Sequence, residues 1–286
     1  MHESKNLELH IVDHCNLDCV ACSHESPFFP KRFEDPDQLA QSLERLWQCY
    51  HTPLLKILGG EPLLHPQINE IIRVVKRLTG ARVRVVTNGT HLRRVIKQLV
   101  GIDELHISVY PSIRIPTDDD LAIFARELNA PITLQAFSSF RWQHSERLHE
   151  APVTQRVFRT CQLFHRWQCH TLRNGWFYPC PPAATWSADR TEGVNLLSAE
   201  VDLPRCLNEL LLRREPFASC AECFGSAGLR MAHTRGWRRV NSDSPAQLDS
   251  SFLSALEVDP GAHNDCFAYQ RTLYPSGEIV QHGFDE

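Results

Sequence analysis

The first 140 residues alternate short apolar runs with longer segments whose apolar residues recur at helical spacing. The short runs indicate buried strands, and the longer segments indicate amphipathic helices. A repeat of strand, helix and strand joins parallel strands through crossover helices. We therefore expect an α/β fold with a parallel sheet. The periodicity is compatible with either a partial barrel or a doubly wound sheet.

Strands are expected at five places, with helices between them. The expected strands are residues 7–12, 54–58, 83–87, 104–110 and 132–137. The expected helices are residues 37–50, 66–78, 91–99 and 118–128. Thr117 is well suited to cap the last helix, because its hydroxyl can accept a hydrogen bond from the first helical turn.

Three cysteines follow the first expected strand. Cys15, Cys19 and Cys22 form a C-x3-C-x2-C pattern. Iron–sulfur clusters normally take four cysteines, so three thiolates can hold three irons of a four-iron cluster and leave the fourth open to a reacting ligand. A zinc site or three structural thiols are the alternatives, and a zinc site would need a further ligand such as His14 or His24.

A Gly-Gly-Glu-Pro turn ends the second expected strand. Gly59 and Gly60 carry no Cβ, so the backbone can approach a ligand closely there. Glu61 adds a carboxylate that can accept a hydrogen bond from an ammonium group. Taken alone, the run from Gly59 to Pro62 could equally be an ordinary strand-to-helix turn.

Together, the cysteine triplet and this turn resemble the radical S-adenosylmethionine (SAM) superfamily. The resemblance implies a partial (β/α)6 TIM barrel, in which a four-iron cluster cleaves SAM to a 5′-deoxyadenosyl radical. It implies SAM binding by six residues, namely Gly59, Gly60, Glu61, Pro62, Asn88 and Ser108. Asn88 could equally contact the substrate or be a plain turn residue, because Asn-Gly is a generic turn signal. Many members carry an aromatic residue before the third cysteine. This chain has Ala21 there, so other groups must hold the adenine.

A second group of cysteines lies beyond residue 140. Cys161 and Cys180 enclose Gly175 in a C-x13-G-x4-C pattern, and Cys220 and Cys223 follow as C-x2-C. The glycine follows an asparagine, and Asn-Gly is a preferred two-residue hairpin loop. The hairpin would fold Cys180 back toward Cys161.

This second pattern looks like the twitch domain, the short relative of the SPASM domain. The resemblance implies one auxiliary [4Fe-4S] cluster on Cys161, Cys180, Cys220 and Cys223, which makes two [4Fe-4S] clusters and SAM the expected cofactors. A zinc site on the same four cysteines is the main alternative. Cys169 could replace Cys161 as a ligand.

These patterns divide the chain into three parts. We expect a radical SAM partial barrel over residues 1–145, a twitch domain built on a β-hairpin and a helix over 146–240, and a C-terminal tail over 241–286 that could close over the barrel mouth. Cys266 lies in a polar part of that tail, where its thiol could give a hydrogen atom to a substrate radical. Cys49 and Cys206 are expected to pack in the core.

Composition limits the classes of partner and the compartment. The chain has 286 residues, a net charge of −4 and eleven cysteines. We find no signal peptide and no run approaching the roughly 20 apolar residues of a membrane span. The cysteines therefore indicate metal or redox chemistry in a cytoplasmic protein. The charge argues against nucleic acid as a partner. A small-molecule substrate and an electron donor such as flavodoxin or ferredoxin are expected instead.

The overall pattern resembles the small twitch-containing radical SAM enzymes of antibiotic biosynthesis, such as neomycin C epimerase and the butirosin-pathway dehydrogenase. The resemblance implies hydrogen abstraction from a carbon of a small polar substrate of sugar, aminocyclitol or nucleoside type. Epimerisation with Cys266 as hydrogen-atom donor is the first expectation, and oxidation of an alcohol through the auxiliary cluster is the second. A peptide-modifying radical SAM enzyme and a non-catalytic zinc or iron–sulfur protein are further alternatives.

Overall fold

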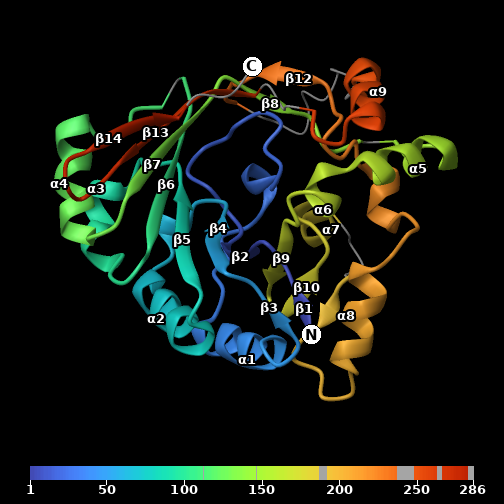
Figure 1. Cartoon of the computed structure of the whole chain (residues 1–286), viewed down its shortest axis with the longest axis horizontal. Coiled ribbons are helices and arrows are strands. Elements are labelled where there is room, and N and C mark those ends of the chain that lie inside the picture. The colour runs from blue at the N-terminus through green and yellow to red at the C-terminus, as the bar shows by residue number, and fades with distance from the viewer. Residues whose placement is uncertain (112, 146, 187–191, 237–247, 263–265, 283–286) are drawn as a thin grey trace.

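A ten-stranded mixed sheet forms the centre of the molecule (Figure 1). The computed structural model describes residues 1–111, 113–145, 147–186, 192–236, 248–262 and 266–282. The strand order is β11-β10-β9-β2-β4-β5-β6-β7-β13-β14. Five consecutive strands in this order are parallel: β2 (Leu7–Val12), β4 (Leu54–Gly59), β5 (Arg82–Thr87), β6 (Glu104–Val109) and β7 (Ile132–Phe137).

Helices cover the outer face of these parallel strands (Figure 1). They are α1 (Pro36–Leu46), α2 (Ile68–Thr79), α3 (Leu92–Val95) continued by the 3-10 turn Ile96–Gln98, and α4 (Asp118–Leu128). Leu7, Leu9 and Ile11 of β2 are buried in the same core as the apolar residues of these helices. Side chains alternate along a strand, so Glu8 and His10 face the inside of the partial barrel.

Most of the expected elements are present with small shifts at their ends. β2, α4 and β7 have the expected limits, and Thr117 forms a capping box with Asp120 at the start of α4. Helix α1 ends earlier than expected, because the residues after it form a short strand, β3 (Tyr50–His51), that pairs with β1 (His2–Glu3). The expected α/β fold with a partial parallel barrel is confirmed.

The sixth parallel strand comes from far along the chain. β9 (His170–Arg173) runs parallel to β2, with His170 opposite Leu7, and β10 (Trp176–Tyr178) pairs antiparallel with β9. Asn174 and Gly175 join β9 and β10 with φ angles of 51° and 77°. This left-handed conformation is the one that an Asn-Gly hairpin loop adopts. The expected hairpin is therefore confirmed, and it extends the barrel sheet.

The remaining strands form the two edges of the central sheet and a separate two-stranded sheet. β13 (Phe267–Leu273) runs antiparallel to β7, β14 (Ile279–His282) lies beyond it, and β11 (Val194–Asn195) forms the opposite edge. β8 (Ser139–Arg141) and β12 (Arg230–Ala232) form a separate two-stranded sheet. The other helical elements are α5 (Ala151–Thr160), α6 (Gln162–His165), α7 (Pro181–Trp186), α8 (Leu203–Leu211), α9 (Ser250–Val258) and the 3-10 turns Ser26–Phe28, Pro62–Leu64 and Ala218–Glu222.

The three-part division of the chain stays a prediction. Its boundaries at residues 146, 240 and 241 lie outside the described residues. All three expected parts contribute strands to one sheet, because β9 joins β2 and β13 joins β7. None of the helices in the described ranges has both the length and the apolar composition that a bilayer span requires.

Candidate functional site

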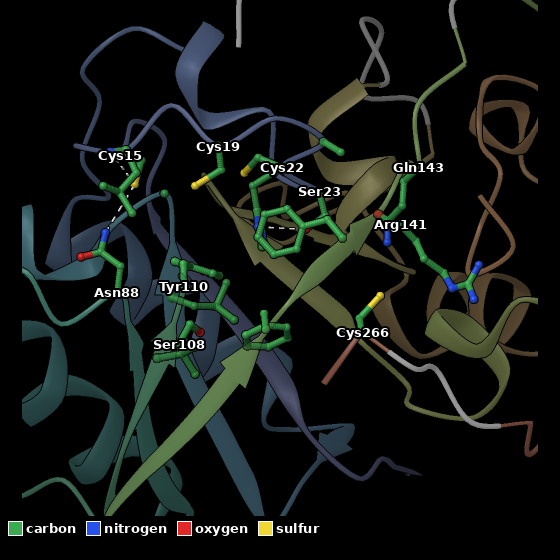
Figure 2. A pocket seen from close by; sticks show the side chains of 18 of the residues that line it. Cys15, Cys19, Cys22, Ser23, Asn88, Ser108, Tyr110, Arg141, Gln143 and Cys266 are labelled. Carbon is green, nitrogen blue, oxygen red and sulfur yellow. Dashed lines mark hydrogen bonds between the residues drawn. The ribbon is translucent and has the colours of Figure 1, made fainter. Parts of the chain in front are cut away.

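A cavity of about 310 Å³ lies at the carboxyl ends of the parallel strands. Its wall is built from the loops and strand ends that follow β2, β4, β5 and β6, and from the start of β13 (Figure 2). Open and barrel-type α/β sheets bind their ligands at this end. Eight of the predicted site residues line the cavity: Cys15, Cys19, Cys22, Gly59, Gly60, Asn88, Ser108 and Cys266.

The three cysteines of the first pattern lie together along one side of this cavity (Figure 2). Leu17 donates its backbone N–H to Cys15 Sγ at 3.3 Å, and Asn88 Nδ2 donates to the same sulfur at 3.7 Å. Burial raises the pKa of Cys15 to about 12. Burial and the nearby Cys22 also raise the pKa of Cys19 to about 12.

Buried thiols of this kind stay protonated unless a cation takes the place of their protons. Hydrogen-bond donors directed at sulfur are also typical of thiolate-ligated clusters. The three cysteines therefore fit a metal group that is held by thiolates and faces the cavity.

Gly59 and Gly60 bring the end of β4 against the start of the cysteine loop. The backbone N–H of Gly60 donates to the Val12 carbonyl at 2.7 Å, and the backbone N–H of Glu61 donates to the His14 carbonyl at 3.1 Å. Gly59 has φ +143°, and a Cβ there would lie 2.4 Å from the Val12 carbonyl oxygen. The two glycines are thus required by the packing of the loop as well as by their place in the cavity wall.

Glu61 and Pro62 lie behind the wall of the cavity and not in it. The Glu61 carboxylate accepts hydrogen bonds from the Leu63 N–H at 3.0 Å, the Thr87 hydroxyl at 2.6 Å and the Asn88 N–H at 2.9 Å. Burial raises the pKa of Glu61 to about 7, and the residue is only 1% exposed. The Glu61 carboxylate thus ties the turn after β4 to the turn after β5, and its expected contact with an ammonium group stays a prediction.

Aromatic side chains that the sequence analysis did not assign form much of the remaining wall. They are Tyr110, Phe137, Phe140, Trp167 and Phe267. Tyr110 and Phe137 could have been found from the sequence, because they lie at the ends of two predicted strands. Trp167 and Phe267 come from segments whose position depends on long-range pairing. The space beside Ala21 is filled by Trp142 and Phe224, which pack against it.

The cavity wall is nearly free of charged groups. Among its described residues there is no lysine, aspartate or glutamate, and the arginine present is Arg141. The Arg141 guanidinium donates to the Gly228 carbonyl at 3.0 Å and to Asp249 at 3.1 Å, and it lies over the Phe252 ring. Figure 2 shows this guanidinium pointing away from the cavity. The described wall therefore turns no lysine or arginine side chain toward the cavity.

Four further cysteines line a second, smaller cavity: Cys161, Cys180, Cys220 and Cys223. Burial raises the pKa of all four thiols, and repulsion between neighbouring thiolates adds to it at Cys180, Cys220 and Cys223. The N–H of Gly225 donates to Cys223 Sγ at 3.1 Å. The expected ligands of the auxiliary cluster thus lie together, and their surroundings fit a thiolate-held metal group.

The other cysteines line neither cavity. Cys169 is buried near Glu8 and Lys56 inside the barrel and does not line the second cavity. Cys49 is in the main core and Cys206 packs against it, as expected. In the described ranges no three His, Cys, Asp or Glu side chains are arranged to hold a single metal ion.

Residues 9–137 match the family model of the Radical SAM superfamily. This segment, somewhat less than half of the chain, is similar to radical SAM domains. It begins in β2 and ends with β7, so it contains the cysteine triplet, the two glycines, Asn88 and Ser108. Members of that superfamily use SAM and a [4Fe-4S] cluster, and a cluster on Cys15, Cys19 and Cys22 stays a prediction that their burial and their sulfur-directed donors fit.

Curated relatives match about a third of this chain. GTP 3′,8-cyclase of Lactiplantibacillus plantarum is 38% identical over 109 residues, which cover 36% of this chain and 32% of that protein. Molybdenum cofactor biosynthesis protein 1 of Homo sapiens is 32% identical over 108 residues, which cover 36% of this chain and 17% of that protein. The matches span a third or less of these relatives' own length.

A solved structure resembles a larger part of the chain. The crystal structure of BtrN in complex with AdoMet and 2-DOIA aligns with a TM-score of 0.52 and 14% sequence identity. The alignment covers 74% of this chain and 88% of that one. At this level of identity the likeness shows a shared fold that extends beyond residues 9–137.

Proposed function

We propose that this chain is a radical SAM enzyme that removes a hydrogen atom from a carbon of a small polar substrate of sugar, aminocyclitol or nucleoside type. The observation that carries the proposal is the convergence of Cys15, Cys19, Cys22 and Cys266 on one cavity (Figure 2). The triplet provides three thiolates for a cluster, and Cys266 provides a thiol on a different wall of the same space.

Each wall of the cavity has a part in this proposal. Cys15, Cys19 and Cys22 would hold a four-iron cluster with one iron open to SAM. With both bound, the site is supplied with a 5′-deoxyadenosyl radical. Backbone atoms of Gly59 and Gly60, and the side chains of Asn88 and Ser108, would contact SAM. The rings of Tyr110, Phe137 and Phe140 would pack on the adenine in place of the aromatic residue missing at Ala21.

The neutral wall favours a substrate without phosphate groups. A triphosphate is normally bound by several arginine or lysine donors. The arginine in the described wall, Arg141, already pairs with Asp249. The serine, histidine and glutamine side chains of this wall can hydrogen-bond to a hydroxylated or amino-substituted ring. We therefore expect the substrate to differ in class from GTP, which the names of the relatives mention.

Epimerisation is the favoured reaction because of Cys266, which is 4% exposed and lines the cavity. Its S–H bond would break as a new C–H bond forms on the face of the substrate radical opposite the abstracted hydrogen. The sulfur radical left behind then needs one electron, which a reductant such as flavodoxin or ferredoxin would supply, and one proton, which water would supply. Dehydrogenation is the second candidate, favoured by the four cysteines of the second cavity, which would hold an electron acceptor.

The radical SAM assignment is tested by replacing Cys15, Cys19 and Cys22 together with alanine. The variant should keep the auxiliary iron and form no 5′-deoxyadenosine from SAM with dithionite. A panel of sugars, aminocyclitols and nucleosides, with GTP for comparison, should stimulate 5′-deoxyadenosine formation by the unaltered protein. Stimulation by GTP alone would contradict the proposed substrate class.

Turnover in heavy water separates the two reactions. A thiol proton exchanges with solvent, so epimerisation should place one deuterium on the product carbon. The Cys266→Ala variant should still abstract the hydrogen atom from the substrate, but it should not form the inverted product. A product two hydrogens lighter, formed at the normal rate by Cys266→Ala, would establish dehydrogenation instead.

A further inference from the structure

The last residues of the described range 192–236 lie directly on the cysteine loop. Val20 donates its N–H to the Thr234 carbonyl at 2.9 Å, and Gly236 donates its N–H to the Asp18 carbonyl at 3.0 Å. Arg235 also pairs with the Asp18 carboxylate at 2.8 Å. These contacts fix the segment against the residues on either side of Cys19.

His233, at the start of this segment, brings a ring nitrogen to the second cysteine. Its Nε2 lies 3.2 Å from Cys19 Sγ, although the two residues are 214 positions apart. The imidazole is stacked on Tyr110, with ring centroids 4.6 Å apart and an interplanar angle of 7°. Phe140 meets the same imidazole edge-on at 5.1 Å. The ring is 8% exposed and is held between these two aromatic side chains.

The hydrogen-bonding pattern of His233 identifies the nitrogen that carries the proton. Nδ1 is buried without a hydrogen-bond partner among the described residues. Nε2 faces a sulfur that becomes a strong acceptor when it is a thiolate. A neutral imidazole with its proton on Nε2 therefore satisfies the contact with Cys19.

We propose that His233 is a positioning residue that donates its Nε2–H to the Cys19 sulfur and so raises the reduction potential of the cluster bound there. This inference rests on the proposed function, because it presumes a cluster on Cys15, Cys19 and Cys22. One-electron reduction places more negative charge on the ligating sulfurs. A hydrogen bond to one of them stabilises the reduced state, and such bonds are among the factors that set the potentials of iron–sulfur clusters.

The test compares two substitutions at this position. His233→Gln keeps a side-chain N–H that can reach the sulfur, whereas His233→Phe keeps the stacking on Tyr110 and has no donor. His51→Phe is the matched control, because His51 also packs on an aromatic ring, that of Trp47, and lies on β3, away from the cavity. Each protein is reconstituted anaerobically and its iron content is measured.

The reduction potential is then measured by a dithionite titration followed by electron paramagnetic resonance. The signal that changes when SAM is added identifies the cluster at the first cavity. His233→Phe should shift the potential of this cluster to more negative values without loss of iron. His233→Gln and His51→Phe should have the potential of the unaltered protein.

The possible results separate this inference from the proposed function. An unchanged potential in His233→Phe, with a SAM-responsive signal present, would overturn the role of His233 and leave the proposed function standing. Loss of about four iron atoms in both His233 variants would also overturn the role of His233. The residue would then be a cluster ligand or would be needed for the protein to fold. The absence of any SAM-responsive signal in the unaltered protein would overturn both proposals.

Discussion

A Cβ placed on Gly60 would lie 2.0 Å from the carbonyl oxygen of His14, the residue before the first cysteine of the triplet. The carbonyl belongs to the backbone, so it cannot move aside without moving the loop that carries Cys15. The position of the cysteine loop therefore depends on the absence of a side chain at Gly60.

Gly60→Ala should displace the cysteine loop as well as weaken SAM binding. We expect the reconstituted protein to hold about four iron atoms instead of about eight, because only the auxiliary cysteines stay in place. Gly80→Ala is the control, since a Cβ there meets nothing within 4 Å and costs only about 1 kcal/mol for its left-handed conformation. Full iron content in Gly60→Ala, with only SAM binding lost, would limit the role of Gly60 to ligand approach.

The auxiliary site provides a second iron measurement. Cys161 lines the second cavity with Cys180, whereas Cys169 lies elsewhere inside the barrel. Cys161→Ala should lower the iron content from about eight to about four atoms, and Cys169→Ala should leave it unchanged. The opposite pattern would make Cys169 the ligand.

Glu61→Gln should destabilise the fold. An amide keeps one acceptor oxygen and turns an NH₂ group toward at least one of the buried donors that the carboxylate now satisfies. At pH 8, where the carboxylate is charged, we expect a loss of about 1–3 kcal/mol in the free energy of unfolding, measured by urea denaturation. Glu127→Gln, at an exposed position on α4, should change the free energy by less than about 0.5 kcal/mol. Equal effects of the two substitutions would contradict the bracing role of Glu61.

Glu104 should make the free energy of unfolding depend on pH. Burial alone would raise its pKa, but a hydrogen bond from His106 and the guanidinium groups of Arg84 and Arg82 lower the pKa to about 2. Since the unfolded value is near 4.5, the stabilisation is complete above pH 4.5 and is lost as the pH falls from there toward 2. Arg82 is largely exposed, so solvent screens its charge. We therefore expect the ionised Glu104 carboxylate to contribute about 2 kcal/mol to the free energy of unfolding.

The measurement for Glu104 is the difference in unfolding free energy between the unaltered protein and Glu104→Gln. That difference should be constant from pH 8 to pH 6 and should shrink between pH 4.5 and pH 3.5. A difference that does not vary with pH would mean that the ion pairs of Glu104 contribute nothing to stability.

Local patterns were enough to predict most of the elements between residues 7 and 137. Leu7–Val12, Asp118–Leu128 and Ile132–Phe137 have the expected limits because apolar periodicity and the Thr117 cap act over a few neighbouring residues. The cysteine triplet and both glycines were likewise found from short spacings, and they lie in one cavity wall.

Contacts between distant segments could not be predicted in this way. No local pattern indicates that β9 pairs with β2, or that β13 covers the free edge of β7 and brings Phe267 to the cavity. His233 gave no signal for the same reason, since its contact with Cys19 depends on the pairing of β12 with β8. The sequence likewise does not reveal that the Thr87 hydroxyl donates a hydrogen bond to the Glu61 carboxylate.

The pairing of Leu7 with His170 has a consequence for biosynthesis. β2 is the first long strand to be translated, yet the strand that covers one of its edges is encoded 163 residues later. At roughly 5–20 residues per second, the ribosome leaves that edge open for on the order of ten seconds. An open apolar strand edge invites pairing with other chains. A nascent chain of this protein is therefore most prone to aggregate before its hairpin has been made, so slower translation or a shortage of chaperones should lower the yield of folded enzyme.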